Sequence, residues 1–203
     1  MLKKLLLAAA LLGIIIYFAQ EVMPSSAVYF ARINKLRHEK NIAFRTSPES
    51  PIPAAQRAQF DSLKYYLATP EFVFAAAITR NPRPDTVIIQ TSTNEAVPYL
   101  RWGLAMFELA EKPHKLTLFR KASGADSTLF IPFADLSNGR ETYGGGRYLD
   151  VARPKADVNE IELDFNQAYN PYCAYNDEYS CPVPPAENRL QVTIPAGEKS
   201  FHD

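Results

Sequence analysis

The sequence predicts a mainly β protein, in which an N-terminal membrane anchor and helices precede an antiparallel β-sandwich or partly closed β-barrel of about seven to eight strands. Two observations predict this class. The 203 residues include 16 prolines and 12% aromatic residues, a composition that favours strands and turns over a helical bundle. Beyond about residue 69 the spacing of apolar residues changes from helical to alternating. We therefore expect a signal anchor over 1–24, a helical segment with a proline-rich connector over 25–66, and a β domain over 67–203.

The first 24 residues have the pattern of a targeting segment. Lys3 and Lys4 precede an uncharged apolar run over 5–19, which is intermediate in length between a signal-peptide core and a full span of about 20 residues. Because positive charge stays on the cytoplasmic side, we expect a single-pass anchor in the inner membrane with the body in the periplasm. The alternative is a cleaved signal with processing near Ala27, which would release a secreted periplasmic protein.

The segment from 25 to 66 is expected to be helical at both ends. A first helix over 26–45 has an apolar face and otherwise charged sides. Prolines stiffen the connector over 47–53, since proline fixes φ and restrains the preceding residue. A second helix is expected over 54–63. The apolar face of the first helix comprises Tyr29, Ile33 and Leu36.

The β domain is predicted from runs of alternating apolar and polar residues separated by turn sequences. The clearest alternation covers 161–166, and a similar one places Leu190, Val192 and Ile194 on one face. Because no helical segment separates the runs, the strands should pair antiparallel. The expected strands cover 71–79, 86–92, 99–109, 114–121, 128–133, 148–151, 158–165 and 189–194.

Residues 139–189 form a dense block of uncommon pairings that includes three consecutive glycines, six tyrosines and both cysteines. Three glycines allow positive φ and close approach of another backbone or a ligand. Backbone N–H groups there could form an anion nest beside a fixed cation. The alternative is a tight bulged turn in which the arginine pairs with a carboxylate and the tyrosines pack. The residues concerned are Tyr143, Gly144, Gly145, Gly146, Arg147 and Tyr148.

A second group in this block combines hydrogen-bonding groups with apolar bodies. Such side chains suit the lining of a small-molecule or peptide pocket. They equally suit the pairing of backbone groups in a long loop packed on the sheet, because buried polar groups must be paired. These candidates are Asn166, Tyr169, Asn170, Tyr172, Tyr175 and Asn188.

The two cysteines, Cys173 and Cys181, are separated by seven residues. In an oxidising compartment this pair predicts a disulfide. Free structural thiols, a metal site and reactive thiols are the alternatives. The spacing is wrong for a zinc pair, and His38, His114 and His202 all lie outside the block. We expect no metal and no cofactor.

The block, together with Arg32, Phe44, Arg57, Phe60 and residues 50–53 upstream, resembles the bacterial and archaeal domain-of-unknown-function family sixteen-eighty-four. The most specific motifs are the run from Glu141 to Leu149 and the run from Tyr169 to Tyr175. The resemblance extends from about Tyr29 to Lys199. It implies a family without an established reaction, so no catalytic residue can be transferred.

Function is expected to be binding rather than catalysis. Lys+Arg and Asp+Glu number 22 each, so the basic surplus of a nucleic-acid binder is missing. The densest motif contains no histidine that could shuttle protons near neutral pH. We expect a membrane-anchored, outward-facing binding module for a small anionic ligand or a peptide, or an accessory subunit of a membrane protein complex. The alternative is a hydrolase-like enzyme with Tyr143, Arg147, Asn166 and Cys173 around its pocket.

Overall fold

A computed structural model of the chain describes residues 26–122 and 127–202. The chain divides into two compact units, residues 1–40 and 41–203. The expected anchor over 1–24 lies outside the described residues. Within the described ranges, no helix is long and apolar enough to cross a membrane.

The helical segment differs from the prediction in its second helix. Helix α2 covers Ser26–Thr46 as expected, whereas α3 covers only Ala54–Arg57, so the helix predicted over 54–63 is too long. The backbone beyond α3 bonds elsewhere: the Leu63 N–H donates to Asn41 Oδ1 at 3.0 Å and the Tyr66 N–H to Gly197 O at 3.0 Å. These bonds replace the helical ones that would have continued α3.

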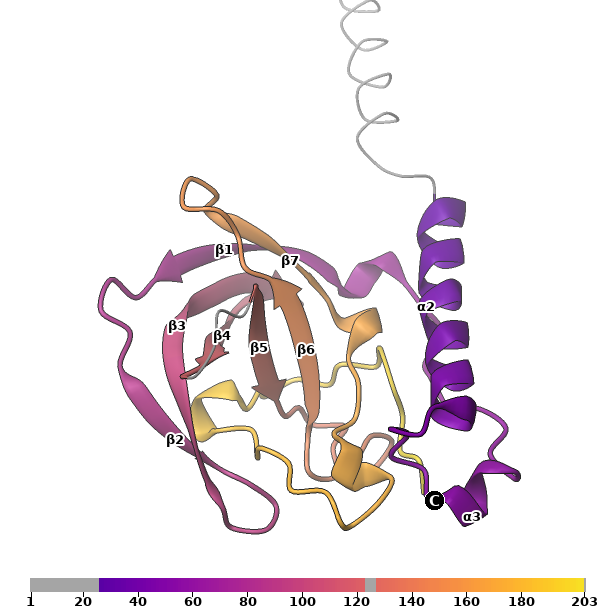
Figure 1. Cartoon of the computed structure of the whole chain (residues 1–203). Coiled ribbons are helices and arrows are strands. Elements are labelled where there is room, and N and C mark those ends of the chain that lie inside the picture. The colour runs from indigo at the N-terminus through magenta and orange to yellow at the C-terminus, as the bar shows by residue number, and fades with distance from the viewer. Residues whose placement is uncertain (1–25, 123–126, 203) are drawn as a thin grey trace, which may run out of the picture. The chain divides into compact units, whose positions relative to one another are not determined.

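Seven strands form one antiparallel sheet that curls into a nearly closed barrel (Figure 1). The sheet order is β6-β5-β4-β3-β1-β7, and β2 pairs with β3 off this path. Of the two architectures that the sequence left open, the barrel is the observed one. The strands are β1 Val73–Arg80, β2 Thr86–Gln90, β3 Ala96–Leu109, β4 Lys112–Lys121, β5 Thr128–Phe133, β6 Arg147–Ala152 and β7 Glu160–Asp164.

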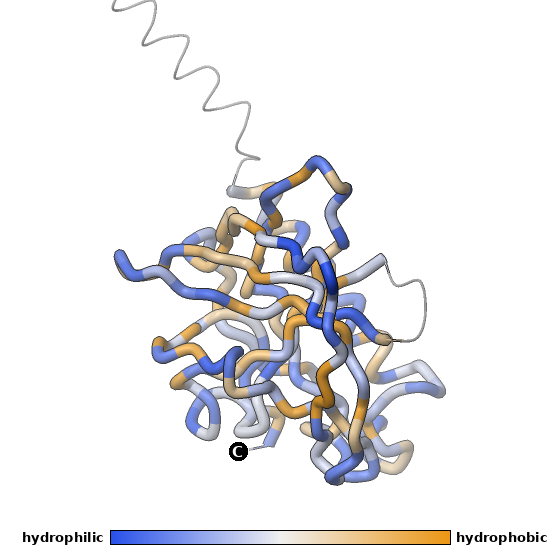
Figure 2. Tube along the Cα trace, turned by 90° about the vertical axis from the view of Figure 1, so that its left-hand side faces the viewer, coloured by the Kyte–Doolittle hydropathy of each residue, from blue (hydrophilic) through white to orange (hydrophobic). Residues whose placement is uncertain are grey.

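One face of the strands packs into the main core. Alternate side chains of β5 and β6 are buried there, including Leu129, Ile131 and Leu149, as the two-residue period of a strand requires. Figure 2 shows apolar and polar residues interspersed along the trace. The core is completed by Phe165 and Ile194 from the C-terminal segment, so this segment is part of the folded body.

A β-bulge in β3 changes the face to which its side chains point. The register with β4 shifts between Arg101 and Gly103. Gly103 faces Thr79 so closely that an added Cβ would lie 2.5 Å from the Thr79 carbonyl oxygen. The bulge lets the long strand serve the main core at one end and a second apolar cluster, around Tyr99, at the other.

The predicted eighth strand, 189–194, is not a strand in the structure. Its alternation is real, since Leu190 and Ile194 are buried. However, its backbone bonds to the loop after β5 rather than to a strand ladder: the Leu190 N–H donates to Ala134 O at 2.8 Å, and Val192 O accepts from the Leu136 N–H at 3.1 Å. The C-terminal segment contains only short 3₁₀ turns, which are η2 Phe165–Gln167, η3 Tyr172–Ala174 and η4 Ala186–Asn188.

Candidate functional site

Arg147 begins β6 and is completely buried. Its Nη2 lies 2.7 Å from Asp135 Oδ2, and both side chains are fully shielded from solvent. The guanidinium also donates to the carbonyls of Ile194, at 2.9 Å, and of Ala196. It lies over the Phe133 ring, 5.3 Å from its centroid. The arginine therefore ties the C-terminal segment to the barrel through a carboxylate and backbone carbonyls.

The glycines before Arg147 are set by close packing. Gly146 has φ +91°, and an added Cβ would lie 2.5 Å from Pro184 Cγ and 2.8 Å from Phe133 O. A Cβ on Gly145 would lie 2.4 Å from the Tyr143 ring. Gly144 is different, because the nearest atom to its added Cβ is 3.7 Å away. The run thus makes a tight turn, closed by the Gly146 N–H donating to Tyr143 O at 3.1 Å.

The three predicted asparagines are buried and pair with backbone. Asn166 accepts from the Thr69 N–H at 2.9 Å and donates to Thr69 O at 2.8 Å. Asn170 donates to Lys199 O at 2.8 Å. Asn188 accepts from the Thr117 N–H at 2.7 Å and donates to Thr117 O at 2.9 Å. Each amide therefore joins segments that are distant in sequence.

A buried glutamate that sequence reasoning missed organises the same region. Glu198 is 1% exposed. Its carboxylate accepts from the Asn170 N–H at 2.8 Å and from the hydroxyls of Tyr65, at 3.3 Å, and Tyr175. Burial, followed by the nearby Glu198 charge, raises the pKa of Tyr175, so this phenol stays a donor. Only the fold reveals this role, because Tyr65 lies 133 positions away.

Tyr148 lies on the face of the sheet opposite the main core. Tyr148 alternates with Leu149 along β6, and Phe130 alternates with Leu129 along β5. Because Leu129 and Leu149 belong to the main core, their strand neighbours point to the other face. Tyr99 packs there as well, with its ring stacked on Phe130 at a centroid distance of 5.5 Å.

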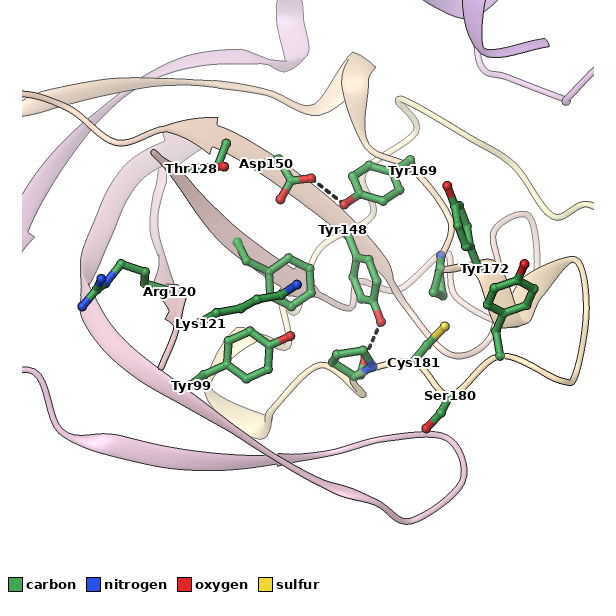
Figure 3. A pocket seen from close by; sticks show the side chains of 14 residues that line it. Tyr99, Arg120, Lys121, Thr128, Tyr148, Asp150, Tyr169, Tyr172, Ser180 and Cys181 are labelled. Carbon is green, nitrogen blue, oxygen red and sulfur yellow. Dashed lines mark hydrogen bonds between the residues drawn. The ribbon is translucent and has the colours of Figure 1, made fainter. Parts of the chain in front are cut away.

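A pocket of about 500 Å³ lies on this opposite face, covered in part by the 169–182 loop (Figure 3). Its volume is within the range of small-molecule sites. Six of the fourteen lining residues are aromatic. Phe130 and Tyr148 meet edge to face at 4.7 Å, and Tyr172 and Tyr179 do so at 5.2 Å. The lining residues are Tyr99, Arg120, Lys121, Thr128, Phe130, Tyr148, Asp150, Tyr169, Pro171, Tyr172, Tyr179, Ser180, Cys181 and Pro182.

The polar groups of the pocket include two cations and one carboxylate. Figure 3 shows Lys121 extending toward Tyr148, whereas the Arg120 guanidinium points away from the ring cluster. Register explains the difference, since Lys121 pairs with Tyr99 across the ladder and shares its face. Asp150 accepts from the Tyr169 hydroxyl at 2.6 Å. The ammonium of Lys121 is thus the charged group presented among the rings.

The pocket phenols are hydrogen-bond donors. The Tyr148 hydroxyl donates to Pro182 O at 2.5 Å. Burial raises the pKa of Tyr148, and burial together with Asp150 raises the pKa of Tyr169. Both groups therefore stay protonated near neutral pH. None of the described residues that line the pocket is a histidine.

Both cysteines are free and buried in the structure, where the sequence predicted a disulfide. The Cys173 N–H donates to Cys181 Sγ at 3.2 Å, and Tyr143 Oη lies 3.6 Å from Cys173 Sγ. Cys181 also forms part of the pocket wall. Among the described residues, no cluster of three or more ligating side chains could hold a metal.

The structure thus separates the predicted site residues into three groups. Tyr148, Tyr169 and Tyr172 line the pocket. Tyr143 contacts the thiol pair. The others are Gly144, Gly145, Gly146, Arg147, Asn166, Asn170, Tyr175 and Asn188, and none of these lines the pocket.

Sequence reasoning missed the pocket residues supplied by β3, β4 and β5, notably Tyr99, Lys121 and Phe130. One signal was present in the sequence. Thr128 and Phe130 share one face of β5, and the buried Leu129 and Ile131 lie on the other. An aromatic residue on the outer face of a strand indicates a pocket only when the segment that covers this face, here the 169–182 loop, is known.

Comparison with known proteins gives a family and a fold. The family model described as "Protein of unknown function (DUF1684)" matches residues 58–199. The structure resembles the solution NMR structure of the uncharacterized protein from gene locus rrnAC0354 of Haloarcula marismortui. The TM-score is 0.70 and the sequence identity 37%, over 88% of this chain and 97% of that chain. No curated protein matches the chain.

Proposed function

The chain belongs to the family of proteins of unknown function DUF1684, and we propose that it is a binding module for a small anionic ligand that carries a planar ring. The ligand would occupy the pocket between the outer faces of β3–β6 and the 169–182 loop. One observation supports this most directly: an ammonium, Lys121, extends into a cavity of about 500 Å³ whose lining includes six aromatic rings.

The ring arrangement suits a planar ligand. Tyr99, Phe130 and Tyr148 form a continuous series of ring contacts on the sheet, and Tyr172 and Tyr179 form another pair on the loop. Aromatic groups prefer offset-stacked or edge-to-face contacts, and each such contact contributes about 0.5–1.5 kcal/mol beyond area burial. A flat ring between the two sets would make several such contacts.

The charge arrangement suits an anion. Lys121 supplies a point charge with three donors, and Arg120 adds a second positive charge at the wall. Asp150 opposes them, yet its carboxylate accepts the hydroxyl of Tyr169. We expect a carboxylate or phosphate group to lie beside Lys121, away from Asp150.

Binding is favoured over catalysis because the phenols of Tyr148 and Tyr169 remain protonated and bond to protein atoms. Two residues of the enzyme alternative, Arg147 and Asn166, are moreover engaged in internal bonds. A general base near neutral pH needs a pKa close to that pH, and the raised pKa values of Tyr148 and Tyr169 do not meet this condition.

Residues 1–24 would place this module at the inner membrane, as a signal anchor with the barrel in the periplasm. The support is the charge and length pattern of the sequence, namely Lys3 and Lys4 before the apolar run over 5–19. An anchored binding module can serve a membrane protein complex as an accessory subunit, so its ligand could be a free metabolite or a group presented by that complex.

The test compares a charged probe with its neutral analogue, by calorimetry on the full chain in detergent. We expect 4-hydroxybenzoate to bind about tenfold more tightly than 4-hydroxybenzamide, which corresponds to about 1.4 kcal/mol. The Lys121→Gln variant should remove this preference, since the neutral probe uses only the rings.

Lys115→Gln is the matched control, because Lys115 is exposed on the same strand and does not line the pocket. Equal binding of both probes to the unmodified protein would refute the anionic ligand. Absence of binding for 4-hydroxybenzoate and also for phenyl phosphate would refute the pocket as a binding site.

A further inference from the structure

The strongest unassigned feature is the pair of thiols beside the pocket. Cys173 lies in the 3₁₀ turn Tyr172–Ala174, and Cys181 is held by Ser92: the Cys181 N–H donates to Ser92 Oγ at 3.1 Å and the Ser92 N–H to Cys181 O at 2.8 Å. The Cys173 N–H donates to Cys181 Sγ at 3.2 Å. The Cys181 thiol is therefore held against the backbone of Cys173.

The surroundings of Cys173 stabilise a thiolate. The hydrogen bond from the Cys181 thiol, joined by those from Tyr143 and Ser92, lowers the pKa of Cys173 to about 6 although burial opposes this. The same contact raises the pKa of Cys181. The other titratable groups that act on this cluster are Tyr148 and Asp177, and neither is a cation.

We propose that Cys173 and Cys181 are a reactive dithiol, in which Cys173 is the nucleophile and Cys181 the resolving thiol, and that a small hydroperoxide oxidises them to a disulfide. This inference goes beyond ligand binding and does not depend on it. A thiolate that is close to a second thiol is the arrangement found in redox-sensing cysteine pairs.

The chemistry needs two steps. The Cys173 thiolate attacks one peroxide oxygen, the O–O bond breaks, and the leaving oxygen takes up a proton and departs as water or alcohol, which leaves a sulfenic acid on Cys173. The Cys181 sulfur then attacks the Cys173 sulfur and loses its proton, the S–O bond breaks, and the sulfenic oxygen leaves as water. Two electrons pass from the two thiols to the peroxide.

Access to the pair is from the pocket side at Cys181, which forms part of the pocket wall, whereas Cys173 is not a lining residue. Cys173 and Cys181 retain 9% and 8% exposure. A hydroperoxide is small enough to use such an opening, whereas a protein disulfide is not. Formation of the S–S bond would change the sulfur of Cys181, which now accepts the Cys173 N–H. Because Cys181 lines the pocket, oxidation would change the pocket wall.

The experiment uses the full chain, first reduced and then freed of reductant. Iodoacetamide labelling with peptide mapping should show Cys173 reacting faster than Cys181 near neutral pH, with a midpoint close to pH 6. One equivalent of hydrogen peroxide should then remove two hydrogens and no more, and block both thiols until a reductant is added.

Variants separate the two roles. In Cys181→Ser, peroxide should stop at a sulfenic acid on Cys173 that dimedone traps. In Tyr143→Phe, the labelling midpoint of Cys173 should rise because one donor to the sulfur is lost. Faster labelling of Cys181 would overturn the assignment of the nucleophile. Labelling of neither thiol in the folded protein, or peroxide consumption without a disulfide, would overturn the reactive pair.

Discussion

Arg147 and Asp135 form an ion pair in which neither side chain is exposed and Nη2 lies 2.7 Å from Oδ2. The carboxylate is bound on its other oxygen as well, since Oδ1 accepts the Ser137 N–H at 2.8 Å and the Ile194 N–H at 3.2 Å. Removal of one partner from such a pair leaves an uncompensated buried charge, which destabilises a protein by about 3–5 kcal/mol.

We therefore expect Arg147→Met to lower the free energy of unfolding by about 3–5 kcal/mol, measured by urea unfolding followed by circular dichroism. The double variant Arg147→Met/Asp135→Asn should recover part of this loss, because it removes the stranded charge. Arg140→Met, at an exposed position in the preceding loop, is the control. An unchanged unfolding midpoint for Arg147→Met would contradict a structural role.

Gly146→Ala should destabilise the fold far more than Gly144→Ala. At Gly146 the backbone has φ +91° and the new methyl would meet Pro184 and Phe133. At Gly144 the nearest atom is 3.7 Å away. The left-handed conformation alone costs an alanine on the order of 1–2 kcal/mol, and the contacts add to this. Thermal unfolding of the two variants side by side gives the comparison, and similar melting temperatures would show that the turn can relax.

Asn188→Ala should lower the free energy of unfolding by about 2–3 kcal/mol. The amide is completely buried and accepts the Thr117 N–H at 2.7 Å, so its loss leaves a buried donor without a partner. Gln191→Ala, exposed in the same segment, serves as the control. Hydrogen exchange of the Thr117 amide is the most specific readout, and it should speed up in Asn188→Ala alone.

Stability should depend on pH through Cys173. Its pKa falls from an ordinary 9.0 to about 6 in the folded protein. Between those values the unfolded chain binds a proton that the folded chain does not, so the free energy of unfolding rises with pH. This contribution is lost as the pH falls through about 6, and Cys181, whose pKa is raised, opposes it above pH 9. Urea midpoints under reductant should therefore rise less in Cys173→Ser than in the unmodified protein, and equal slopes would exclude a folded-state thiolate.

The targeting prediction is tested by fractionation. The full chain should remain in the membrane pellet after carbonate washing, whereas a chain starting at residue 25 should be released. This follows from the uncharged run over 5–19, which favours the bilayer interior. A signal cleaved near Ala27 would instead give a soluble periplasmic product with a shorter mass. Size and mass analysis of the detergent extract also shows whether a larger assembly accompanies the protein.

The strand pattern was predictable because burial follows a two-residue period wherever one face is covered. The run over 161–166 and strand β7, Glu160–Asp164, illustrate this. The run over 189–194 shows the limit, since Leu190 and Ile194 are buried as predicted while the backbone finds partners in a loop. Periodicity reports which side chains are covered, and it does not report what the backbone bonds to.

The site was less predictable than the fold. Arg147 and the preceding glycines are conspicuous in the sequence. However, the hydrogen-bond acceptors of Arg147 are Asp135 and carbonyls within residues 194–198, and no sequence motif links these positions to Arg147. Lys121 and Tyr99 carry no motif at all. They meet in the pocket because the ladder places them opposite one another, and pairing of this kind is known only once the sheet order is known.

The side-chain amide of Asn188 makes hydrogen bonds to backbone atoms of two neighbouring strands, as a main-chain peptide group would. Strands β4 and β5 share a single aligned pair, Phe119 and Phe130, so they diverge where Thr117 and Pro132 would otherwise meet. The Asn188 amide occupies this opening: it exchanges two hydrogen bonds with Thr117 and gives a third to Pro132 O at 2.9 Å. Hydrogen bonds that would otherwise join β4 and β5 directly are therefore made through a side chain from the C-terminal segment. The pairing of β4 with β5 in the native barrel is thus completed by a residue that lies 56 or more positions further along the chain than its partners.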